Sequence, residues 1–304
     1  MTDAPFSTFQ PLAIEDRSTL IPRFRDYFPE TTEGSFATLF LWRRRYGFRW
    51  RMWKDWVFVV GQDAEGTFGL MPVGAADRRE AARALSLFIA EGPSARIEWA
   101  DQRFADEIRH EPGCVIEPVR DCFDYVYPAD FLIHLPGQAY QAKRNHIHRF
   151  ERMHPFHYAP LEAADIPVCL AVAEEAVHRD PSNSNLAGEF AAISEAFAHF
   201  SALELKGGTI RIDGKIEAFA VGGLLNPETA LIYFEKANPG FPGLHAVINQ
   251  RFLENAWPHV RWVNREDDAG HPGLRKSKLS YHPARLVPKY RITLPVAPAS
   301  NYFD

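Results

Sequence analysis

Apolar and polar positions follow two periods along this chain, and the periods alternate in the same order twice. In residues 33–46 and 77–89, apolar side chains recur near the three- and four-residue spacing of an amphipathic helix. In residues 48–52 aromatic and basic side chains alternate, which is the period of a half-exposed strand. For residues 9–127 we therefore predict a strand, two helices, a hairpin, a strand, a helix, a strand, a helix and a strand.

The same order returns in the second half of the chain. Its centre is a predicted hairpin around Asp213 and Gly214, because both residue types tolerate positive φ in a two-residue turn. The predicted elements are a basic helix at 136–152, a strand at 156–161, helices at 164–178 and 186–200, strands at 205–212, 216–225 and 230–235, a helix at 244–255, a strand at 260–263, a helix at 273–280 and a strand at 289–294.

This repeated order predicts an α/β (α+β) protein of two tandem mixed-sheet domains with helices on both faces. The chain has 304 residues, which is enough for two domains of ordinary size. We place the boundary after Cys122, so that residues 1–122 form the N-terminal domain and residues 123–304 form the C-terminal domain. We expect the N-terminal domain to be scaffold, because it has no counterpart of the charged cluster that follows Val263.

Composition narrows the class of protein. Apolar residues make up 46% and charged residues 24% of the chain, which is typical of a globular protein with a large core. There is no apolar run of the roughly 18 residues that a membrane-spanning helix needs, and the first residues do not form a secretory signal. With three cysteines in no metal-binding pattern and a net charge of −5, we expect a cytoplasmic protein with no DNA partner.

The first candidate site is the connection between the predicted strand at 230–235 and the helix at 244–255. Glu235 ends the strand, and Asn238 and Gly243 lie in the loop. Loops of this kind present backbone N–H groups at a helix N-terminus, where they can stabilise a phosphate or a developing oxyanion. An ordinary strand-to-helix connection explains the same sequence.

The second candidate site follows the predicted strand at 260–263. Glu266 and Asp268 come directly after it, where ligand clefts form in open α/β sheets, and either carboxylate is a candidate general base. Arg275, Lys276 and Lys278 lie on the next predicted helix. This mixture of charges could hold a phosphate, or it could neutralise itself in a solvated turn.

Basic residues form the third candidate site. Lys143 and Arg144 belong to a basic stripe on the predicted helix at 136–152, and residues 269–303 contain six basic residues and no acidic one. Such surfaces bind polyanions such as RNA, or are solvated faces paired elsewhere in the fold. We predict no metal site, because His146 and His148 would point about 200° apart on a helix.

Four segments together resemble a known bacterial family: TTEGSFATLFLWRRRYGF, FDYVYPADFLIHLPGQAYQAKRNHIHRF, YFEKANPGFPGLHAVIN and NREDDAGHPGLRKSKLSYHPARLVPKY. The family shares its domain with the C-terminal catalytic part of phosphatidylglycerol lysyltransferase. The resemblance runs from about residue 9 to residue 294, and its most specific blocks are 143–150 and 264–290. It implies a tandem of two GNAT (acetyltransferase-type) folds, as in the Fem-like peptidoglycan aminoacyltransferases.

The resemblance also implies a donor and an acceptor. In GNAT enzymes the loop equivalent to residues 238–243 cradles the pyrophosphate of acyl-CoA, with the pattern Q/R-x-x-G-x-G/A. The loop here lacks the basic first residue and the Gly-x-Gly pair, which favours aminoacyl-tRNA over acyl-CoA as the donor. No bound cofactor is required. The acceptor is a small molecule or a lipid-like molecule, but lysyltransferases carry a membrane-spanning part that this sequence lacks, so a lipid acceptor does not follow directly.

The implied reaction is direct transfer. An acceptor amine or hydroxyl attacks the donor carbonyl, backbone N–H groups of residues 234–237 polarise that carbonyl, and Glu266 or Asp268 takes the proton. The residues expected to bind donor or substrate are Lys143, Arg144, Glu235, Asn238, Gly243, Asn264, Arg275, Lys276, Lys278 and Tyr281. Two alternatives stay open: an inactive module that binds tRNA or an amino-acid-bearing ligand, and an interaction protein that uses the aromatic segment at 42–56.

Overall fold

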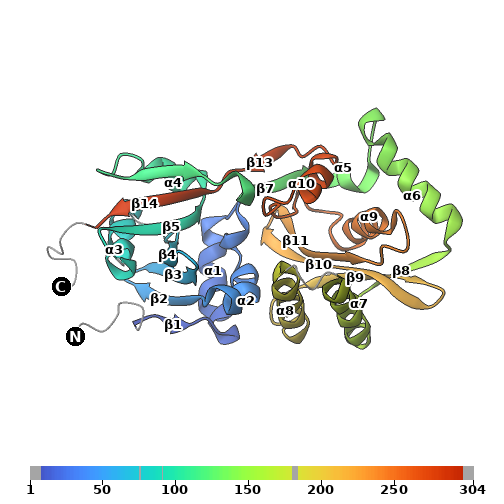
Figure 1. Ribbon diagram of the computed structural model, residues 1–304, viewed down its shortest axis with the longest axis horizontal. Helices are drawn as coiled ribbons and strands as arrows, with labels where there is room; N and C mark the ends of the chain where they lie inside the picture. The colour runs from blue at the N-terminus through green and yellow to red at the C-terminus, as the bar shows by residue number, and fades with distance from the viewer. Residues whose placement is uncertain (1–7, 75–76, 91, 180–183, 297–304) are drawn as a thin grey trace. The chain divides into compact units, whose positions relative to one another are not determined.

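The computed structural model describes residues 8–74, 77–90, 92–179 and 184–296, and these form two units. Each unit contains a seven-stranded mixed sheet with helices on both faces, as Figure 1 shows. The predicted fold class is therefore confirmed. Among the described residues, no helix combines the length and the apolar character needed to cross a membrane.

The N-terminal unit contains the elements that the hydrophobic pattern predicted, in the predicted order. Its elements are β1 (Gln10–Pro11), α1 (Arg17–Tyr27), α2 (Phe36–Tyr46), β2 (Arg49–Trp53), β3 (Trp56–Asp63), β4 (Gly66–Leu70), α3 (Arg78–Ile89), β5 (Ser94–Ala100), α4 (Gln102–Ile108) and β6 (Val115–Pro118). Residues 32–34 form a separate 3-10 turn, and α2 begins only after Ser35, whose hydroxyl accepts a hydrogen bond from the backbone of Thr38. The last predicted strand, at 115–127, is wrong as a single strand, because residues 115–118 and 124–128 form two strands in different sheets.

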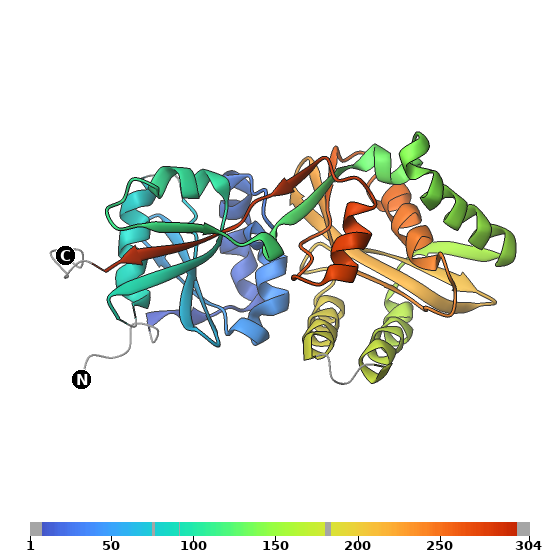
Figure 2. The same cartoon turned by 45° about the horizontal axis from the view of Figure 1, so that its top comes forward.

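The C-terminal unit repeats this order. Its elements are α5 (Ala129–His134), α6 (Gln141–Met153), β8 (Phe156–Pro160), α7 (Ile166–Arg179), α8 (Ser184–Ala198), β9 (Lys206–Ile212), β10 (Lys215–Asn226), β11 (Thr229–Ala237), α9 (Leu244–Ala256), β12 (Trp262–Asn264), α10 (Pro272–Leu279) and β13 (Arg285–Val287). Helices α7 and α8 lie on one side of the sheet and α9 lies on the other, in both Figure 1 and Figure 2.

Two local features of this unit follow directly from residue type. The predicted hairpin is confirmed, since Asp213 and Gly214 link β9 to β10 with φ values of 49° and 80°. The predicted basic helix at 136–152 is partly wrong. Its body is α6, but a separate helix, α5, precedes it and ends at Leu135 in the left-handed region. Gly137, with φ of 75°, then turns the chain into α6.

The two sheets exchange one strand each. The strand β14 (Tyr290–Pro295) lies between β5 and β6 in the N-terminal sheet, antiparallel to both, and is drawn in red there in Figure 1. The strand β7 (Asp124–Pro128) lies between β12 and β13 in the C-terminal sheet. In the repeated order of elements β7 ends the first half and β14 ends the second half, so each sheet contains the last strand of the other half.

This exchange changes the expected division of the chain. The first segment of the N-terminal unit ends at Asp124, two residues beyond the boundary that we predicted. The C-terminal segment does not stay with the second unit, because residues 267–271 and the described residues from Leu286 onward pack with the N-terminal unit. Sequence order could not reveal this return, since β14 has the same strand pattern in either sheet.

Each sheet contains a pair of neighbouring strands that is parallel and paired over only two or three residues. The strands β4 and β5 pair through Gly69 with Ile97 and Leu70 with Glu98. The strands β11 and β12 pair through three residues at the start of β11, of which Leu231 with Asn264 is the last. Beyond Leu231, β11 continues to Ala237 with ladder pairing to β10 alone within the described residues. The sheet therefore opens beside the second half of β11.

Candidate functional site

A buried ion pair spans the opening between β11 and β12. Glu235 lies on β11 beyond the last residue paired with β12, and Arg265 directly follows β12. An Arg265 guanidinium nitrogen, Nη2, lies 2.5 Å from Glu235 Oε2, and each side chain is only 8% exposed. The two strands thus stay linked by side chains where their backbones separate.

Helix α9 supplies the other partner of this carboxylate. The Asn249 amide donates from Nδ2 to Glu235 Oε1 at 2.5 Å, and Asn249 is only 1% exposed. The remaining polar atoms are less well satisfied, because Asn249 Oδ1 and Arg265 Nε are buried without a hydrogen-bond partner in the described part of the chain. A buried polar atom in that state costs about 1–3 kcal/mol, so this cluster is incomplete by itself.

Electrostatics keep both members of the pair charged. Burial by itself would raise the pKa of Glu235, but the charge of Arg265 and the hydrogen bond from Asn249 outweigh it, so that pKa is lowered. Burial would lower the pKa of Arg265, but the charge of Glu235 reverses this and the pKa is raised. The pair is therefore ionised throughout the physiological pH range.

A tyrosine ring lies close to two cations, one of which belongs to the ion pair. The Arg265 guanidinium carbon is 5.0 Å from the centre of the Tyr281 ring, and Lys143 Nζ is 4.0 Å from the same centre. Burial raises the pKa of the Tyr281 hydroxyl, which therefore stays protonated. The pKa of Lys143 is lowered, first by burial and then by the charge of Arg265. Four elements thus meet at one place: α6, β11, the residues after β12 and the residues after α10.

Lys278 supports this cluster from inside the fold. It is the buried residue of α10, and its Nζ donates to the backbone carbonyl of Arg265 at 2.5 Å. Its own carbonyl accepts a hydrogen bond from the Tyr127 hydroxyl at 2.9 Å. The ammonium of Lys278 thus holds the backbone that carries Arg265, and a substrate contact of Lys278 stays a prediction.

The loop between β11 and α9 is folded around Asn238. The Asn238 amide donates to Glu217 Oε2 at 2.7 Å, its side-chain oxygen accepts from the backbone of Gly240, and its carbonyl accepts from the backbone of Phe241. Residues 239 and 242 are prolines without an N–H. Only the N–H of Gly243 remains outside these bonds in the loop at 239–243, so the loop is a poor cradle for a pyrophosphate.

The other predicted binding residues are spread over the same unit. Asn264 is fully buried, and its side-chain oxygen accepts from the backbone of Glu266 at 2.8 Å, which shapes the turn after β12. The Arg144 guanidinium donates to the carbonyls of Leu135 and Gly137, so it fixes the start of α6. On α10, Lys276 is exposed and Arg275 is half-buried.

The two candidate bases separate into different units. Glu266 belongs to the C-terminal unit, where its carbonyl accepts from the backbone of Tyr125 at 3.1 Å and its φ is 55°. Asp268 belongs to the N-terminal unit and is fully buried. Its carboxylate accepts from the backbone of Gly270 at 3.0 Å and lies 3.4 Å from the Arg120 guanidinium.

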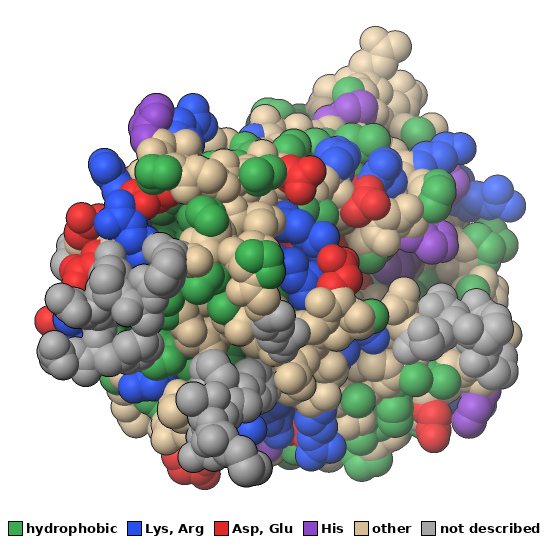
Figure 3. All heavy atoms as spheres, turned by 60° about the vertical axis from the view of Figure 1, so that its left-hand side comes forward, with side chains coloured by type: hydrophobic (Ala, Val, Ile, Leu, Met, Phe, Trp, Pro, Cys, Tyr) green, Lys and Arg blue, Asp and Glu red, His purple; other side chains and the backbone are tan. Residues whose placement is uncertain are grey.

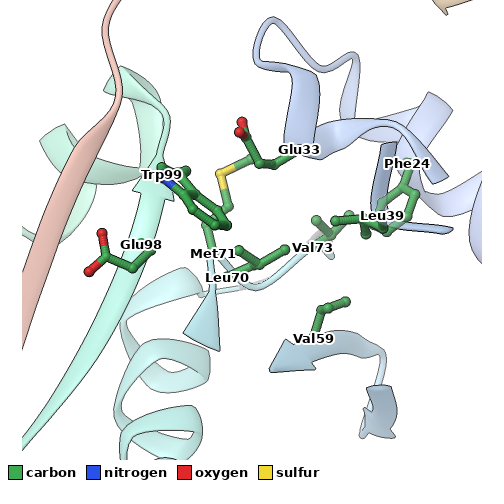
Figure 4. Close-up of a pocket in the computed structure, with 9 residues that line it drawn as sticks. All are labelled: Phe24, Glu33, Leu39, Val59, Leu70, Met71, Val73, Glu98 and Trp99. Carbon is green, nitrogen blue, oxygen red and sulfur yellow. The ribbon is translucent and has the colours of Figure 1, made fainter. Parts of the chain in front are cut away.

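The corresponding opening of the N-terminal sheet is filled by side chains. Figure 4 shows Met71 and Trp99 close together at the ends of β4 and β5, with Glu33 beside them. The cavity that they line holds only about 10 Å³, which is near the minimum for one water molecule. Trp99 has φ of 54°, a conformation that is uncommon for a bulky residue. The position equivalent to the Glu235 site is therefore lined by packed side chains around a small cavity.

A buried lysine lies near this filled opening. Lys289 is fully buried and pairs with Glu33 and Asp124, each at 2.8 Å. Arg291 pairs with Glu65 at 3.0 Å and with Glu98 at 2.6 Å. Two of the six cations in the basic C-terminal stretch are thus neutralised inside the N-terminal unit. On the face shown in Figure 3, acidic and basic side chains likewise lie next to one another.

Two mixed sheets of matching order, each with an opened parallel strand pair, define a tandem GNAT or Fem-like fold. The chain belongs to the family described as "Phosphatidylglycerol lysyltransferase, C-terminal", whose profile matches residues 25–293. No curated protein sequence matches it.

Three solved structures are similar to this chain. A conserved protein of unknown function from Bacteroides thetaiotaomicron VPI-5482 is 29% identical, with a TM-score of 0.84 over 94% of this chain and 99% of that one. The C-terminal domain of a putative lysylphosphatidylglycerol synthetase from Agrobacterium fabrum is 14% identical, with a TM-score of 0.61 over 92% and 91%. FemX is 8% identical, with a TM-score of 0.62 over 93% and 96%.

Part of this cluster could be predicted from the sequence and part of it could not. Glu235, Lys143 and Tyr281 were predicted binding residues, and the structure brings them together. Arg265 and Asn249 were not predicted. Arg265 was visible as one of four consecutive charged residues, but nothing in the sequence pairs it with Glu235. Asn249 stands as a polar residue on the buried face of a predicted helix, and that is the one signal that could have found it.

Proposed function

We propose that the C-terminal unit transfers an aminoacyl group from aminoacyl-tRNA to an amine or hydroxyl acceptor in the cytoplasm. The observation that carries this proposal is the incomplete polar cluster at the opening of the sheet. Two almost fully buried side chains, Asn249 and Arg265, keep polar atoms without partners within the described residues. Buried polar groups in folded proteins nearly always have hydrogen-bond partners, so we infer that a polar group of the substrate bonds to these two atoms.

The backbone of β11 gives this cluster a way to polarise a carbonyl. Beyond Leu231 the edge of β11 that faces β12 has left the ladder, so N–H groups between Phe234 and Ala237 can point at a donor carbonyl oxygen. The charge of Arg265 lies beside this edge and is held by Glu235. The charged group that would contact a substrate there is therefore already fixed in place before the substrate binds.

For the proton acceptor we propose Glu266 ahead of Asp268. Glu266 is half-buried, lies in the same unit as the cluster and follows Arg265 directly. Asp268 is fully buried in the other unit, with its carboxylate already bonded to the backbone of Gly270. A base must reach the attacking amine or hydroxyl, which favours the more accessible carboxylate.

The loop at 238–243 supports aminoacyl-tRNA rather than acyl-CoA as the donor. In that loop two residues are prolines, and the N–H groups of Gly240 and Phe241 are bonded to Asn238. A pyrophosphate needs several converging N–H groups at a helix N-terminus. The cluster instead offers an unpaired amide oxygen on Asn249 and an unpaired guanidinium N–H on Arg265, which suit the polar groups of an aminoacyl ester.

A transfer assay and a binding assay together test the proposal. Wild-type protein is incubated with aminoacyl-tRNA charged with labelled amino acids and a mixture of amine and hydroxyl acceptors, and labelled product is measured. In parallel, melting temperatures are recorded with charged tRNA, uncharged tRNA and acetyl-CoA, because a ligand of the folded state raises the melting temperature. We expect labelled product and a shift with charged tRNA that exceeds the shift with uncharged tRNA.

Two variants make the assay specific to the cluster. Glu235→Gln removes the charge that holds Arg265, and we expect at least a hundredfold loss of transfer, comparable to losing one main transition-state contact. The matched control is Glu228→Gln, which changes an exposed glutamate of the same unit and should retain full transfer. Full activity of Glu235→Gln, or a melting shift with acetyl-CoA alone, would contradict the proposal.

The second candidate function is a binding module without catalysis. It is favoured by the loop at 238–243, which departs from the phosphate-binding pattern of active GNAT enzymes. In that case charged tRNA would bind stably, Glu235→Gln would weaken binding, and no labelled product would form with any acceptor.

A further inference from the structure

Three hydrogen-bond donors around the Tyr281 ring lack a partner. Lys143 Nζ and the Tyr281 hydroxyl make no hydrogen bond or ion pair within the described residues, and Arg265 Nε is buried and unpaired there. Tyr281 is 5% exposed and Arg265 is 9% exposed, and Arg265 Nε is shielded from bulk water. Lys143 is half-buried.

The local charges leave a positive excess. Glu235 is the carboxylate of this cluster, and Arg265 neutralises it at 2.5 Å. Lys143 adds a second cation, which has no carboxylate partner in the described part of the chain and lies 4.0 Å from the centre of the Tyr281 ring. A ligand that enters here gains most if it is an anion.

The shape of the donor set indicates which anion. Glu235 takes one N–H of Arg265 Nη2, so the donors that remain are the other N–H groups of the guanidinium, Nε among them, one phenol O–H and one ammonium, from three different elements. A planar carboxylate is best bound by an intact arginine fork. Hydrogen-bond donors that come from different elements instead suit a tetrahedral phosphate, which has several oxygens. A lysine binds such a phosphate as a point charge.

We propose that Lys143, Tyr281 and Arg265 form a phosphate subsite in the C-terminal unit, with Lys143 at its entrance. This subsite rests on the proposed function in one respect: the phosphate is taken to belong to a substrate of the transfer reaction. That substrate is either the donor, through its terminal nucleotide, or a lipid-like acceptor, through its headgroup. Its location differs from the phosphate contacts that the sequence suggested, since Arg144 and Lys278 are both used to hold backbone.

Binding of inorganic phosphate tests the subsite directly. Isothermal titration calorimetry and phosphorus NMR are run on the full chain with inorganic phosphate, followed by adenosine 5′-monophosphate and glycerol 3-phosphate. We expect saturable phosphate binding, weakened about tenfold or more in Lys143→Ala, because a hydrogen bond to a charged group contributes about 1.5–3 kcal/mol. Tyr281→Phe should weaken it by a smaller factor, and Lys143→Arg should retain most of the affinity.

The matched control is Lys215→Ala, which removes an exposed lysine at the β9–β10 turn of the same unit and should leave phosphate binding unchanged. Tighter binding of adenosine 5′-monophosphate than of glycerol 3-phosphate would assign the phosphate to the donor, and the reverse order to the acceptor. Absence of saturable phosphate binding in wild type, or equal affinity in wild type and a folded Lys143→Ala, would overturn the subsite. Phosphate binding without any transfer would keep the subsite and reject the transferase.

Discussion

Replacing Lys289 by methionine should destabilise the N-terminal unit strongly. The Lys289 ammonium is fully buried and lies 2.8 Å from Glu33 Oε1, Asp124 Oδ1 and the Thr32 hydroxyl. Methionine fills a similar volume but leaves two carboxylates buried without their cation. Breaking a buried pair in this way costs about 3–5 kcal/mol, which is a large part of the 5–15 kcal/mol that stabilises a typical domain.

The cost should depend on pH with a definite sign. Burial raises the pKa of Glu33 from its ordinary value to about 7, against the opposing charge of Lys289. A raised pKa means that the folded state binds more protons than the unfolded state, so stability falls as pH rises toward 7. Without Lys289 the pKa of Glu33 should rise further. The difference in the free energy of unfolding between wild type and Lys289→Met should therefore be small near pH 4.5 and largest near pH 8.

Urea unfolding at several pH values, followed by far-ultraviolet circular dichroism, measures this difference. The matched control is Lys54→Met, which breaks an exposed pair with Glu80 in the same unit and should cost less than about 1 kcal/mol. If Lys289→Met also costs less than about 1 kcal/mol at pH 8, or if its cost does not change with pH, the buried cluster does not have the energetics described.

Three further predictions concern single features. Gly243→Ala should destabilise the protein by about 1–3 kcal/mol in urea unfolding, because φ is 99° there and a Cβ would lie 3.0 Å from the carbonyl oxygen of His146; an unchanged midpoint would contradict this. Burial raises the pKa of Cys122 to about 12, so its thiol should react with a disulfide reagent at pH 8 far more slowly in the native protein than in urea, and equal rates would be incompatible with its environment. Arg265→Met should cost about 3–5 kcal/mol by leaving Glu235 unpaired, whereas adding Glu235→Leu should recover most of that loss; a double variant less stable than Arg265→Met would refute the pairing.

The sequence was most informative where one local rule decides the structure. The Asp213-Gly214 hairpin follows from the turn alone, and α3 follows from the spacing of its buried alanines and leucine. The repeated order of elements followed in the same way and was sufficient to predict two tandem units. Short elements were harder: α5 has only six residues, and its pattern merges with the basic segment that follows it.

The candidate site could be predicted only in part, because it depends on contacts between distant segments. Glu235 and Tyr281 stood out through their places after predicted elements, but the pairing of Glu235 with Arg265 requires that β11 and β12 lie side by side and then diverge. The charge of Lys278 suggested a ligand contact, whereas its ammonium is bonded to the backbone of Arg265. A charged residue type does not reveal whether its charge faces a ligand or another part of the same chain.

The exchanged strand β14 determines when the N-terminal sheet can finish folding during translation. During translation the strands β5 and β6 leave the ribosome early, but the strand that joins them, β14, is among the last residues made. Until then the N-terminal sheet has an unfilled space between two strand edges, and such edges readily pair with other chains. The C-terminal sheet has no such delay, because β7 precedes all of its other strands. The unit that emerges first from the ribosome is therefore the last to be completed.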